Sequence, residues 1–264
     1  MIEASLLSVV FAAATPLETT ALAGVDLVIP DGQFLTVIGS NGAGKTTLLN
    51  AIAGEVPLAS GRLTIDGEEV TDWPAPRRAR LIARVFQDPL AGTCEALTVE
   101  ENLALALARG RSRGLRPALD RSRRALLAEK LAPLGLGLER RLGDRIGLLS
   151  GGQRQVVSLV MATLAPMRIL LLDEHTAALD PRTATFVLDL TRRLVAEAGL
   201  TALMVTHSMR QALDCGSRTV MMHEGKIVLD VDGQARASLD VPDLVGLFEK
   251  VRGERLVDDA LLLG

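Results

Sequence analysis

A glycine-rich loop after residue 38 has the residue types and spacing of a phosphate-binding site. It fits the pattern G-x-x-x-x-G-K-[ST] and lies between an apolar run, Phe34–Ile38, and a helical pattern that starts at Lys45. Its glycines let backbone N–H groups close around a phosphate, and the helix N-terminus adds positive potential. We expect Lys45 to bridge the β- and γ-phosphates of a nucleotide and the Thr46 hydroxyl to bind Mg²⁺. The expected nucleotide-binding residues here are Gly39, Ser40, Asn41, Gly42, Ala43, Gly44, Lys45, Thr46 and Thr47.

Two adjacent carboxylates follow an apolar strand later in the chain. Ile169–Leu172 is a continuous apolar run, typical of a buried parallel strand, and Asp173 and Glu174 come directly after it. Ligands bind at the carboxyl ends of such strands. We expect Asp173 to hold Mg²⁺ through its water shell and Glu174 to polarise an attacking water. The alternative, two carboxylates that merely end a strand, is less favoured in a chain that also has a phosphate-binding loop.

A second possible phosphate-binding device lies about a hundred residues after the first. It consists of Ser150, Gly151, Gly152 and Gln153. Ser150 is a favoured N-cap and the glycines expose backbone donors, so this helix start can bind a γ-phosphate. An ordinary capped helix with a flexible entry is the alternative. A single nucleotide site does not need both devices.

The rest of the sequence predicts the elements that must position these loops. Short apolar runs between turn residues predict strands before residue 90, beginning with the N-terminal run Leu6–Ala14. Thr98 and Glu101 form a capping-box pattern at the start of a helical region. The expected helices are Lys45–Ala53, Val99–Ala108, Pro117–Leu131, Gly151–Ala165 and Pro181–Ala198, and the expected later strands are Ile82–Phe86, Ile169–Leu172, Thr201–Thr206 and a hairpin of Arg218–His223 with Lys226–Asp230.

This order of elements predicts an α/β fold. We expect a P-loop NTPase core with a parallel sheet, an N-terminal antiparallel β subdomain and an inserted α-helical subdomain. The 264 residues are expected to form a single domain. Its expected parts are the core, 1–89 and 166–240, the helical subdomain, 90–165, and a C-terminal helix and tail, 241–264.

The amino-acid composition indicates a globular protein and argues against several other classes. Hydrophobic residues make up 48% of the chain, with 29 basic and 32 acidic residues, which is typical of a globular protein. The net charge of −3 gives no overall attraction to nucleic acid. Cys94 and Cys215 lie in no metal-binding pattern and are expected to be free thiols in a reducing cytosol. No basic residue precedes the N-terminal apolar run, which argues against a signal peptide, and no apolar run is long enough to span a membrane.

The run Leu149-Ser150-Gly151-Gly152-Gln153, here called the signature loop, points to a protein family that the chain resembles over essentially its whole length. The chain resembles the ATP-binding-cassette (ABC) ATPases, whose defining sequence is LSGGQ. In that family the signature of one subunit completes the phosphate site of another, so that two ATP molecules lie in a head-to-tail dimer. The resemblance therefore implies ATP and Mg²⁺ as ligands and a second copy of the subunit as partner.

Two strand ends match further positions of the family. Gln87 follows the expected strand Ile82–Phe86 and resembles the Q-loop glutamine, which contacts Mg²⁺ and the attacking water. His207 follows Leu203–Thr206 and resembles the switch histidine that contacts the γ-phosphate. Without the resemblance, a polar strand end and a structural histidine are the ordinary interpretations of these residues.

Asp180 and Phe11 match the family at two other positions. Asp180 resembles the D-loop aspartate, which crosses the dimer, and it also suits the N-cap of the helix that begins at Pro181. Phe11 stands where the family usually has a tyrosine that stacks on adenine. A core phenylalanine is the other interpretation of Phe11.

The sequence departs from the family pattern at two positions. The phosphate loop reads Lys45-Thr46-Thr47 where Lys-Ser-Thr is commoner, which leaves a hydroxyl available for Mg²⁺. His175 stands where a proline usually follows the catalytic glutamate. A residue of a surface loop is the favoured interpretation of His175, with pH sensing or contact with the partner subunit as alternatives.

The stretch from Arg109 to Arg124 contains seven arginines. It is interpreted as solvated helix faces, with a lipid- or partner-facing surface as the alternative.

Several stretches are similar to one importer subgroup, which is labelled as amino-acid uptake systems of tryptophan/tyrosine type. They are Arg84–Thr93, Gly147–Ser150 and Asp173–Pro181. The resemblance implies an ATPase that drives an integral membrane permease, which would dock near Gln87–Cys94, with a solute-binding protein as an indirect partner. The expected location is peripheral, on the cytoplasmic face of the inner membrane.

Two other functions stay open. One is a stand-alone cassette ATPase that acts on DNA or ribosomes, although the chain has neither a long coiled-coil insertion nor a second cassette, and no nucleic acid is expected as partner. The other is a simple phosphate-loop kinase or GTPase, which would not depend on a second subunit.

Overall fold

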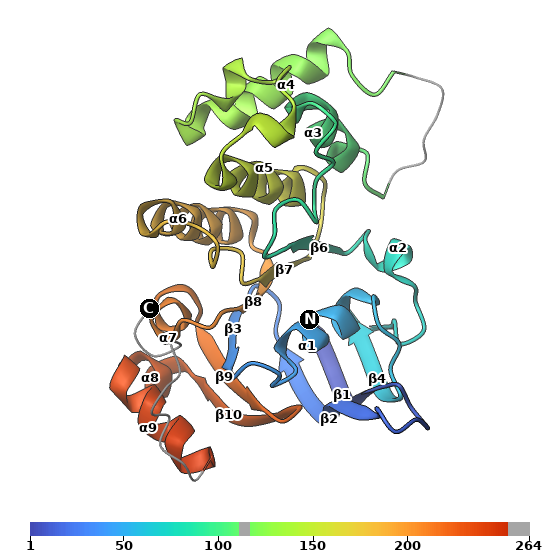
Figure 1. Ribbon diagram of the computed structural model, residues 1–264, viewed down its shortest axis with the longest axis vertical. Helices are drawn as coiled ribbons and strands as arrows, with labels where there is room; N and C mark the ends of the chain where they lie inside the picture. Colours follow the sequence, from blue (N-terminus) through green and yellow to red (C-terminus); the bar gives the residue numbers. More distant parts are fainter. Residues whose placement is uncertain (111–116, 253–264) are drawn as a thin grey trace.

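The computed structural model describes residues 1–110 and 117–252 of the chain. Two β-sheets form its lower part in Figure 1, and a group of helices stands above them. The middle of the arginine-rich stretch, residues 111–116, and the tail from residue 253 lie outside the described residues.

The smaller sheet is antiparallel and is formed by the N-terminal part of the chain. Its strand order is β2-β1-β4-β5. The expected N-terminal strand is present, but it ends at Phe11 and not at Ala14, because Ala12 and Ala14 adopt left-handed φ angles of 50° and 61° in the turn of the hairpin. The strands are β1 (Ile2–Phe11), β2 (Thr19–Ile29), β4 (Ser60–Ile65) and β5 (Glu68–Glu69).

The larger sheet has the strand order β10-β9-β3-β8-β7-β6. Neighbouring strands from β9 to β6 are parallel, and β10 pairs with β9 as the expected antiparallel hairpin. Alternate side chains of β7 point to opposite faces, so that Ile169 and Leu171 enter one core and Leu170 and Leu172 the other. The strands are β3 (Phe34–Gly39), β6 (Ile82–Val85), β7 (Ile169–Asp173), β8 (Thr201–Val205), β9 (Arg218–His223) and β10 (Lys226–Asp232).

Helix α1 (Lys45–Ala53) packs between the two sheets (Figure 1). Its buried Leu48, Leu49 and Ile52 share one hydrophobic core with inward-facing residues of both sheets. The helix ends where predicted, at Gly54, whose left-handed φ of 77° lets its N–H bond back to the carbonyl of Ala51.

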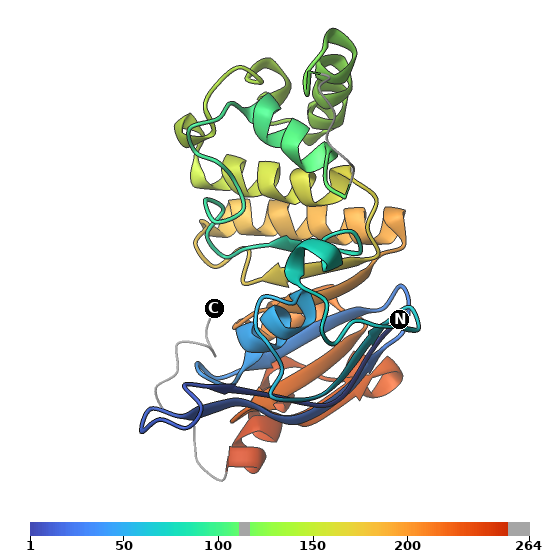
Figure 2. The same ribbon diagram turned by 90° about the vertical axis from the view of Figure 1, so that its right-hand side faces the viewer.

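Among the described residues between 99 and 164, three longer helices form the upper part of the molecule (Figure 2). The capping box of Thr98 and Glu101 is confirmed. The second helix begins later than Pro117, because the Asp120 side chain caps it by accepting from the Arg123 N–H. The elements are α3 (Val99–Leu107), α4 (Arg121–Leu131) and α5 (Gly151–Leu164), with short 3₁₀ turns at Ala132–Leu134, Leu138–Arg140 and Ile146–Leu148.

Helix α6 (Pro181–Ala198) links this upper part to the larger sheet. It packs beside α5 in both views, and its Val187 and Leu190 share a core with β7 and β8 (Figure 2). The remaining helices are α2 (Ala75–Arg78), α7 (Met209–Cys215), α8 (Gly233–Ala237) and α9 (Val241–Arg252). Among the helices of the described residues, none combines the length and apolarity that crossing a membrane requires.

The expected fold class is confirmed: an antiparallel N-terminal sheet and a mostly parallel sheet combine with an added group of helices. The division of the chain at residues 89, 165 and 240 stays a prediction.

Candidate nucleotide-binding and catalytic site

The phosphate loop, Gly39–Thr46, wraps around the side chain of its own lysine. The Lys45 ammonium donates to the carbonyl oxygens of Gly39 and Ser40, at 2.7 and 3.0 Å. Gly44 is required at its position, because its φ is 98° and a Cβ there would lie 2.5 Å from the carbonyl oxygen of Ala21. The loop is therefore fixed by backbone geometry and by the smaller sheet behind it.

A cavity of about 320 Å³ opens over the phosphate loop. The lining comes from the start of β2, the phosphate loop, the first turn of α1 and the end of β7. These residues are Thr19, Thr20, Ala21, Asn41, Gly42, Ala43, Gly44, Lys45, Thr46, Thr47 and Glu174. Seven of the nine expected residues between Gly39 and Thr47 therefore line one cavity, and Gly39 and Ser40 do not.

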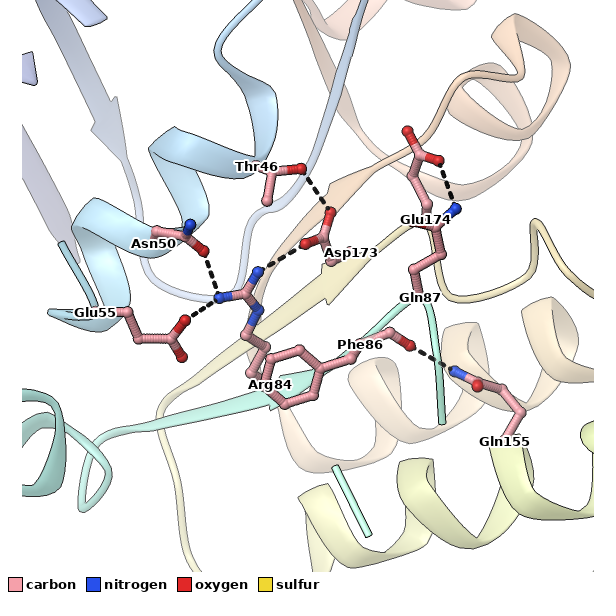
Figure 3. Close-up of polar contacts among 9 residues, drawn as sticks. All are labelled: Thr46, Asn50, Glu55, Arg84, Phe86, Gln87, Gln155, Asp173 and Glu174. Atoms are coloured by element: carbon pink, nitrogen blue, oxygen red, sulfur yellow. Dashed lines mark hydrogen bonds and ion pairs between the residues drawn. The ribbon is translucent and has the colours of Figure 1, made fainter. Parts of the chain in front are cut away.

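Two of the three expected metal-binding side chains, Thr46 and Asp173, are in contact beside this cavity, whereas the third, Gln87, contacts Glu174 (Figure 3). The Thr46 hydroxyl donates to Oδ1 of Asp173 at 3.2 Å, and Asp173 is buried at the end of β7. The other oxygen of Asp173, Oδ2, accepts from the Arg84 guanidinium at 2.7 Å. A hydroxyl and a carboxylate are hard oxygen donors, which Mg²⁺ prefers, so these residues fit a magnesium ion.

Glu174 lies at the centre of the candidate catalytic groups. Its φ of 43° places it in the left-handed region, where a non-glycine residue is strained. Its Oε2 atom lies 3.4 Å from the Gln87 amide nitrogen and 3.5 Å from Nδ1 of His207. The hydrogen bond from His207 lowers the pKa of Glu174, with the charges of His207 and Lys45 acting in the same direction and burial opposing them. Glu174 is therefore ionised at neutral pH.

The signature loop starts α5 away from the phosphate loop. Ser150 and Gln153 form a reciprocal capping box, each side chain accepting from the backbone N–H of the other at 3.2 Å. Gly152 packs closely on the next helix, because a Cβ there would lie 2.3 Å from Cγ2 of Thr183. Gly151 faces open space, so this helix start presents its backbone to the surroundings.

A second cavity, of about 410 Å³, opens at the signature loop. It shares no lining residue with the cavity over the phosphate loop. Asp180, the D-loop candidate, caps α6 nearby by accepting from the Thr183 N–H at 3.1 Å. Hydrogen bonding to the Thr183 side chain first, and to the Thr183 backbone second, lowers the pKa of Asp180. The second cavity is lined by Leu136, Ser150, Gly152, Gln153, Val156, Arg182, Thr183 and Phe186.

Phe11 lies at the end of β1 and is 43% exposed, so its interpretation as a core phenylalanine is wrong. It pairs across the hairpin with Thr19, which lines the cavity over the phosphate loop, although Phe11 itself does not line that cavity. Phe11 therefore stands beside the candidate nucleotide site with its ring available to a ligand.

The surface interpretation of His175 is also wrong. This residue is 1% exposed, and its Nε2 lies 3.0 Å from the hydroxyl of Thr191 on α6. The turn after β7 passes under α6, and burial there lowers the pKa of His175 to about 4. The histidine is neutral at pH 7 and joins the turn to the helix.

The arginine-rich stretch only partly fits its interpretation as solvated helix faces. Arg121 and Arg124 are exposed on α4, as expected. Arg109 instead donates to the carbonyl oxygens of Ala162 and Ala165 at the end of α5, where burial lowers its pKa.

Arg84 is a member of the site that the sequence patterns did not predict. Arg84 lies on β6 and is bonded to Asp173, with its side chain 8% exposed. An arginine inside the apolar strand pattern around Ile82–Phe86 was the available signal, since charged residues are almost never fully buried unless they are paired. Thr19, Thr20 and Ala21 were also missed, because only the closing of β2 against the phosphate loop brings them to the cavity.

Comparison with known proteins shows which family the chain is similar to. Residues 22–177, more than half of the chain, match the family model described as ABC transporter. The chain is 44% identical over 230 residues to a tyrosine transport ATP-binding protein of Clostridioides difficile (strain R20291), covering 87% of this chain and 91% of that protein. It is 36% identical over 214 residues to the aliphatic sulfonates import ATP-binding protein SsuB 2 of Agrobacterium fabrum (strain C58 / ATCC 33970), covering 81% of this chain and 74% of that protein.

A solved structure supports the same assignment. The chain superposes on the ATP-binding cassette MJ0796, in a dimeric post-hydrolysis state bound to ADP and Pi, with a TM-score of 0.75 and 29% identity. The superposition covers 88% of this chain and 98% of that chain. The expected resemblance, including its tyrosine-type subgroup, is confirmed by these relatives. The chain belongs to the ATP-binding-cassette family of transporter ATPases.

Proposed function

We propose that this chain is the ATP-hydrolysing subunit of a bacterial importer, which works as a head-to-tail dimer on a membrane permease. The observation that supports the dimer most directly is the separation of the two phosphate-binding devices into cavities with no residue in common. Neither cavity alone contains both a phosphate loop and a signature loop. A second copy that supplies its signature loop to the phosphate loop of the first would complete both sites.

Each polar group at the phosphate loop has a role in this proposal. Lys45 and the loop N–H groups bind the β- and γ-phosphates, while Thr46 and Asp173 hold Mg²⁺ with help from Gln87. The ion, when bound, neutralises charge that develops on the transferred phosphoryl group. Glu174 is ionised and accepts a hydrogen bond from the attacking water, and His207 contacts the γ-phosphate.

The groups around the signature loop serve the partner subunit in this proposal. Ser150, Gly151 and Gly152 present hydroxyl and N–H donors, with the positive end of α5 behind them, to the γ-phosphate bound by the partner. Gln153 holds the loop by the capping box. Asp180 crosses the dimer, and Phe11 stacks on the adenine of the nucleotide bound by its own subunit.

The segment Gln87–Cys94 is the proposed docking place of the permease. It begins two residues after the end of β6 and leads towards α3, and Cys94 is exposed within it. The ATPase would then lie peripherally on the cytoplasmic face of the inner membrane. A solute-binding protein would act on the other side of that membrane.

The cargo proposed is an amino acid or a similar small solute. The named relative from C. difficile, a tyrosine transport ATP-binding protein, supports an aromatic amino acid as the first candidate. This choice is tested by measuring the uptake of radiolabelled tyrosine and tryptophan in two strains. One strain carries the unsubstituted chain and the other carries the Lys45→Ala variant. Equal uptake of both amino acids in the two strains would contradict it.

Co-purification separates the importer from the stand-alone alternative. The tagged chain, extracted from membranes in mild detergent, is expected to bring down an integral membrane protein, and this complex should protect Cys94 from a maleimide reagent. Cys215 provides the internal control, because burial raises the pKa of its thiol to about 11 and makes it unreactive in either state. Recovery with ribosomes or DNA, and no protection of Cys94, would support the alternative function.

A further inference from the structure

Arg84 links the candidate metal carboxylate to helix α1. One guanidinium nitrogen donates to Asp173 Oδ2 at 2.7 Å, and another donates to Oδ1 of Asn50 at 2.6 Å and pairs with Glu55 (Figure 3). The side chains of Arg84 and Asp173 are 8% and 10% exposed, so this ion pair is largely shielded from water. Arg84 thus holds the oxygen of Asp173 that does not accept from Thr46.

The guanidinium is itself held by neighbouring groups. It stacks over the ring of Phe86, with 4.7 Å between the guanidinium carbon and the ring centroid. The carbonyl oxygen of Phe86 accepts from the Gln155 amide on α5 at 3.3 Å. A planar arginine with donors on two sides suits such a position, whereas a lysine offers only a point charge.

Stability alone does not explain an arginine at this position. Within the described residues its buried Nε atom has no hydrogen-bond partner, and such an unpaired donor costs free energy. Replacement of a buried ion pair by apolar residues is often neutral or stabilising. The charge balance also suits a metal site: Glu55 offsets the charge of Arg84, so the cluster retains the negative charge of Asp173.

We propose that Arg84 is a positioning residue of the ATPase site, which holds Oδ2 of Asp173 so that Oδ1 stays directed at Thr46 and the metal. The proposal rests on the assignment of Asp173 to the magnesium site in the proposed function. Mg²⁺ demands near-ideal octahedral geometry, so a carboxylate that is free to rotate serves it poorly. The effect of Arg84 is exerted through Asp173, without contact with the nucleotide.

Metal binding tests the proposal independently of turnover. Mn²⁺ serves as the probe, and its affinity for the complex with a non-hydrolysable ATP analogue is measured by electron paramagnetic resonance. Arg84→Met is expected to weaken Mn²⁺ binding at least five-fold while analogue binding in EDTA stays within two-fold of the unsubstituted protein. With Mg²⁺, kcat should fall about ten-fold and the KM for ATP should stay within three-fold, because the phosphate loop is intact.

Matched variants separate this role from general stabilisation. Arg168→Met removes another arginine–carboxylate pair, the one with Asp66, and is expected to change neither measurement. Arg84→Lys should give an intermediate loss. Glu55→Gln should give a two- to three-fold loss in the same direction, because it removes a support of Arg84 and leaves Asp173 in place.

The reference variant Asp173→Asn distinguishes the possible failures. If Asp173→Asn loses Mn²⁺ binding while a folded Arg84→Met keeps both Mn²⁺ affinity and kcat, the positioning role is overturned and the proposed function stands. If Asp173→Asn also binds Mn²⁺ normally, the metal assignment itself fails. Should Arg84→Met not fold, unchanged Mn²⁺ affinity and kcat in both Arg84→Lys and Glu55→Gln would overturn the role.

Discussion

Oε2 of Glu174 lies 3.5 Å from Nδ1 of His207, and each residue perturbs the other. The contact raises the pKa of His207 and lowers that of Glu174. The parallel strands β7 and β8 deliver the pair to one sheet edge, since Asp173 and Val205 are paired in register just before it. The proposed base and the proposed γ-phosphate sensor are therefore in contact with each other.

Glu174→Gln tests the proposed base. Glutamine keeps the size of the side chain but removes its negative charge, so ATP should bind and hydrolysis should fall about 100-fold or more. The trapped ATP should then hold two copies together, which size-exclusion chromatography with light scattering detects. A variant that stays monomeric in saturating ATP, or that turns over normally, would count against the mechanism.

Mixed dimers test the completion of each site by the partner. Ser150→Arg should abolish hydrolysis by blocking the signature loop, while ATP binding to the monomer stays largely intact; Lys45→Ala should abolish ATP binding. A mixture of the two inactive proteins should recover activity, because one of its two sites combines an unaltered phosphate loop with an unaltered signature loop. Ser122→Arg, on the exposed face of α4, is the control and should retain full activity. No recovery in the mixture would contradict the shared sites.

Local sequence patterns predicted the elements that carry the site because the residues that begin and end these elements act on neighbours only a few positions away. Gly54 ends α1 by its own left-handed φ, and Ser150 starts α5 through a side chain three residues from its partner. The strand order that brings Thr46 beside Asp173 also follows a common rule, since parallel strand ends share one edge.

Longer-range packing explains what the sequence did not predict. His175 looks like a loop residue by pattern, and only the position of α6 buries it against Thr191. Arg84 is paired with Asp173, 89 residues away in the chain. Such contacts depend on how the elements pack on one another, which no local pattern contains.

Phe11→Ala tests adenine stacking. Aromatic stacking is worth about 0.5–1.5 kcal/mol, so the Kd for ATP should rise about 2- to 10-fold. Phe11→Tyr should bind ATP as well as the unsubstituted protein, since it keeps the ring. Leu17→Ala, at an exposed apolar residue in the same hairpin, is the control and should not change the Kd. Fluorescence titration with a labelled ATP analogue measures the Kd of the three variants and of the unsubstituted protein. An unchanged Kd in Phe11→Ala would mean that Phe11 is not part of the site.

The buried His175 predicts a loss of stability in mild acid. Its pKa is about 4 in the folded protein, against 6.5 in the unfolded chain, so between these values the unfolded state binds more protons. The free energy of unfolding should therefore fall as the pH drops from 6.5 towards 4, and this residue should contribute about 3 kcal/mol to the fall. Other groups contribute to the same slope, so the comparison must be with a variant.

His175→Gln isolates this contribution. Glutamine has no titrating group in this range and still offers hydrogen-bonding atoms to Thr191. Urea unfolding at several pH values between 7.5 and 4.5 should show the difference in unfolding free energy between the two proteins shifting towards the variant by about 2–3 kcal/mol as the pH falls. Parallel stability curves for the two proteins would mean that folding leaves the pKa of His175 unchanged, in conflict with its burial under α6.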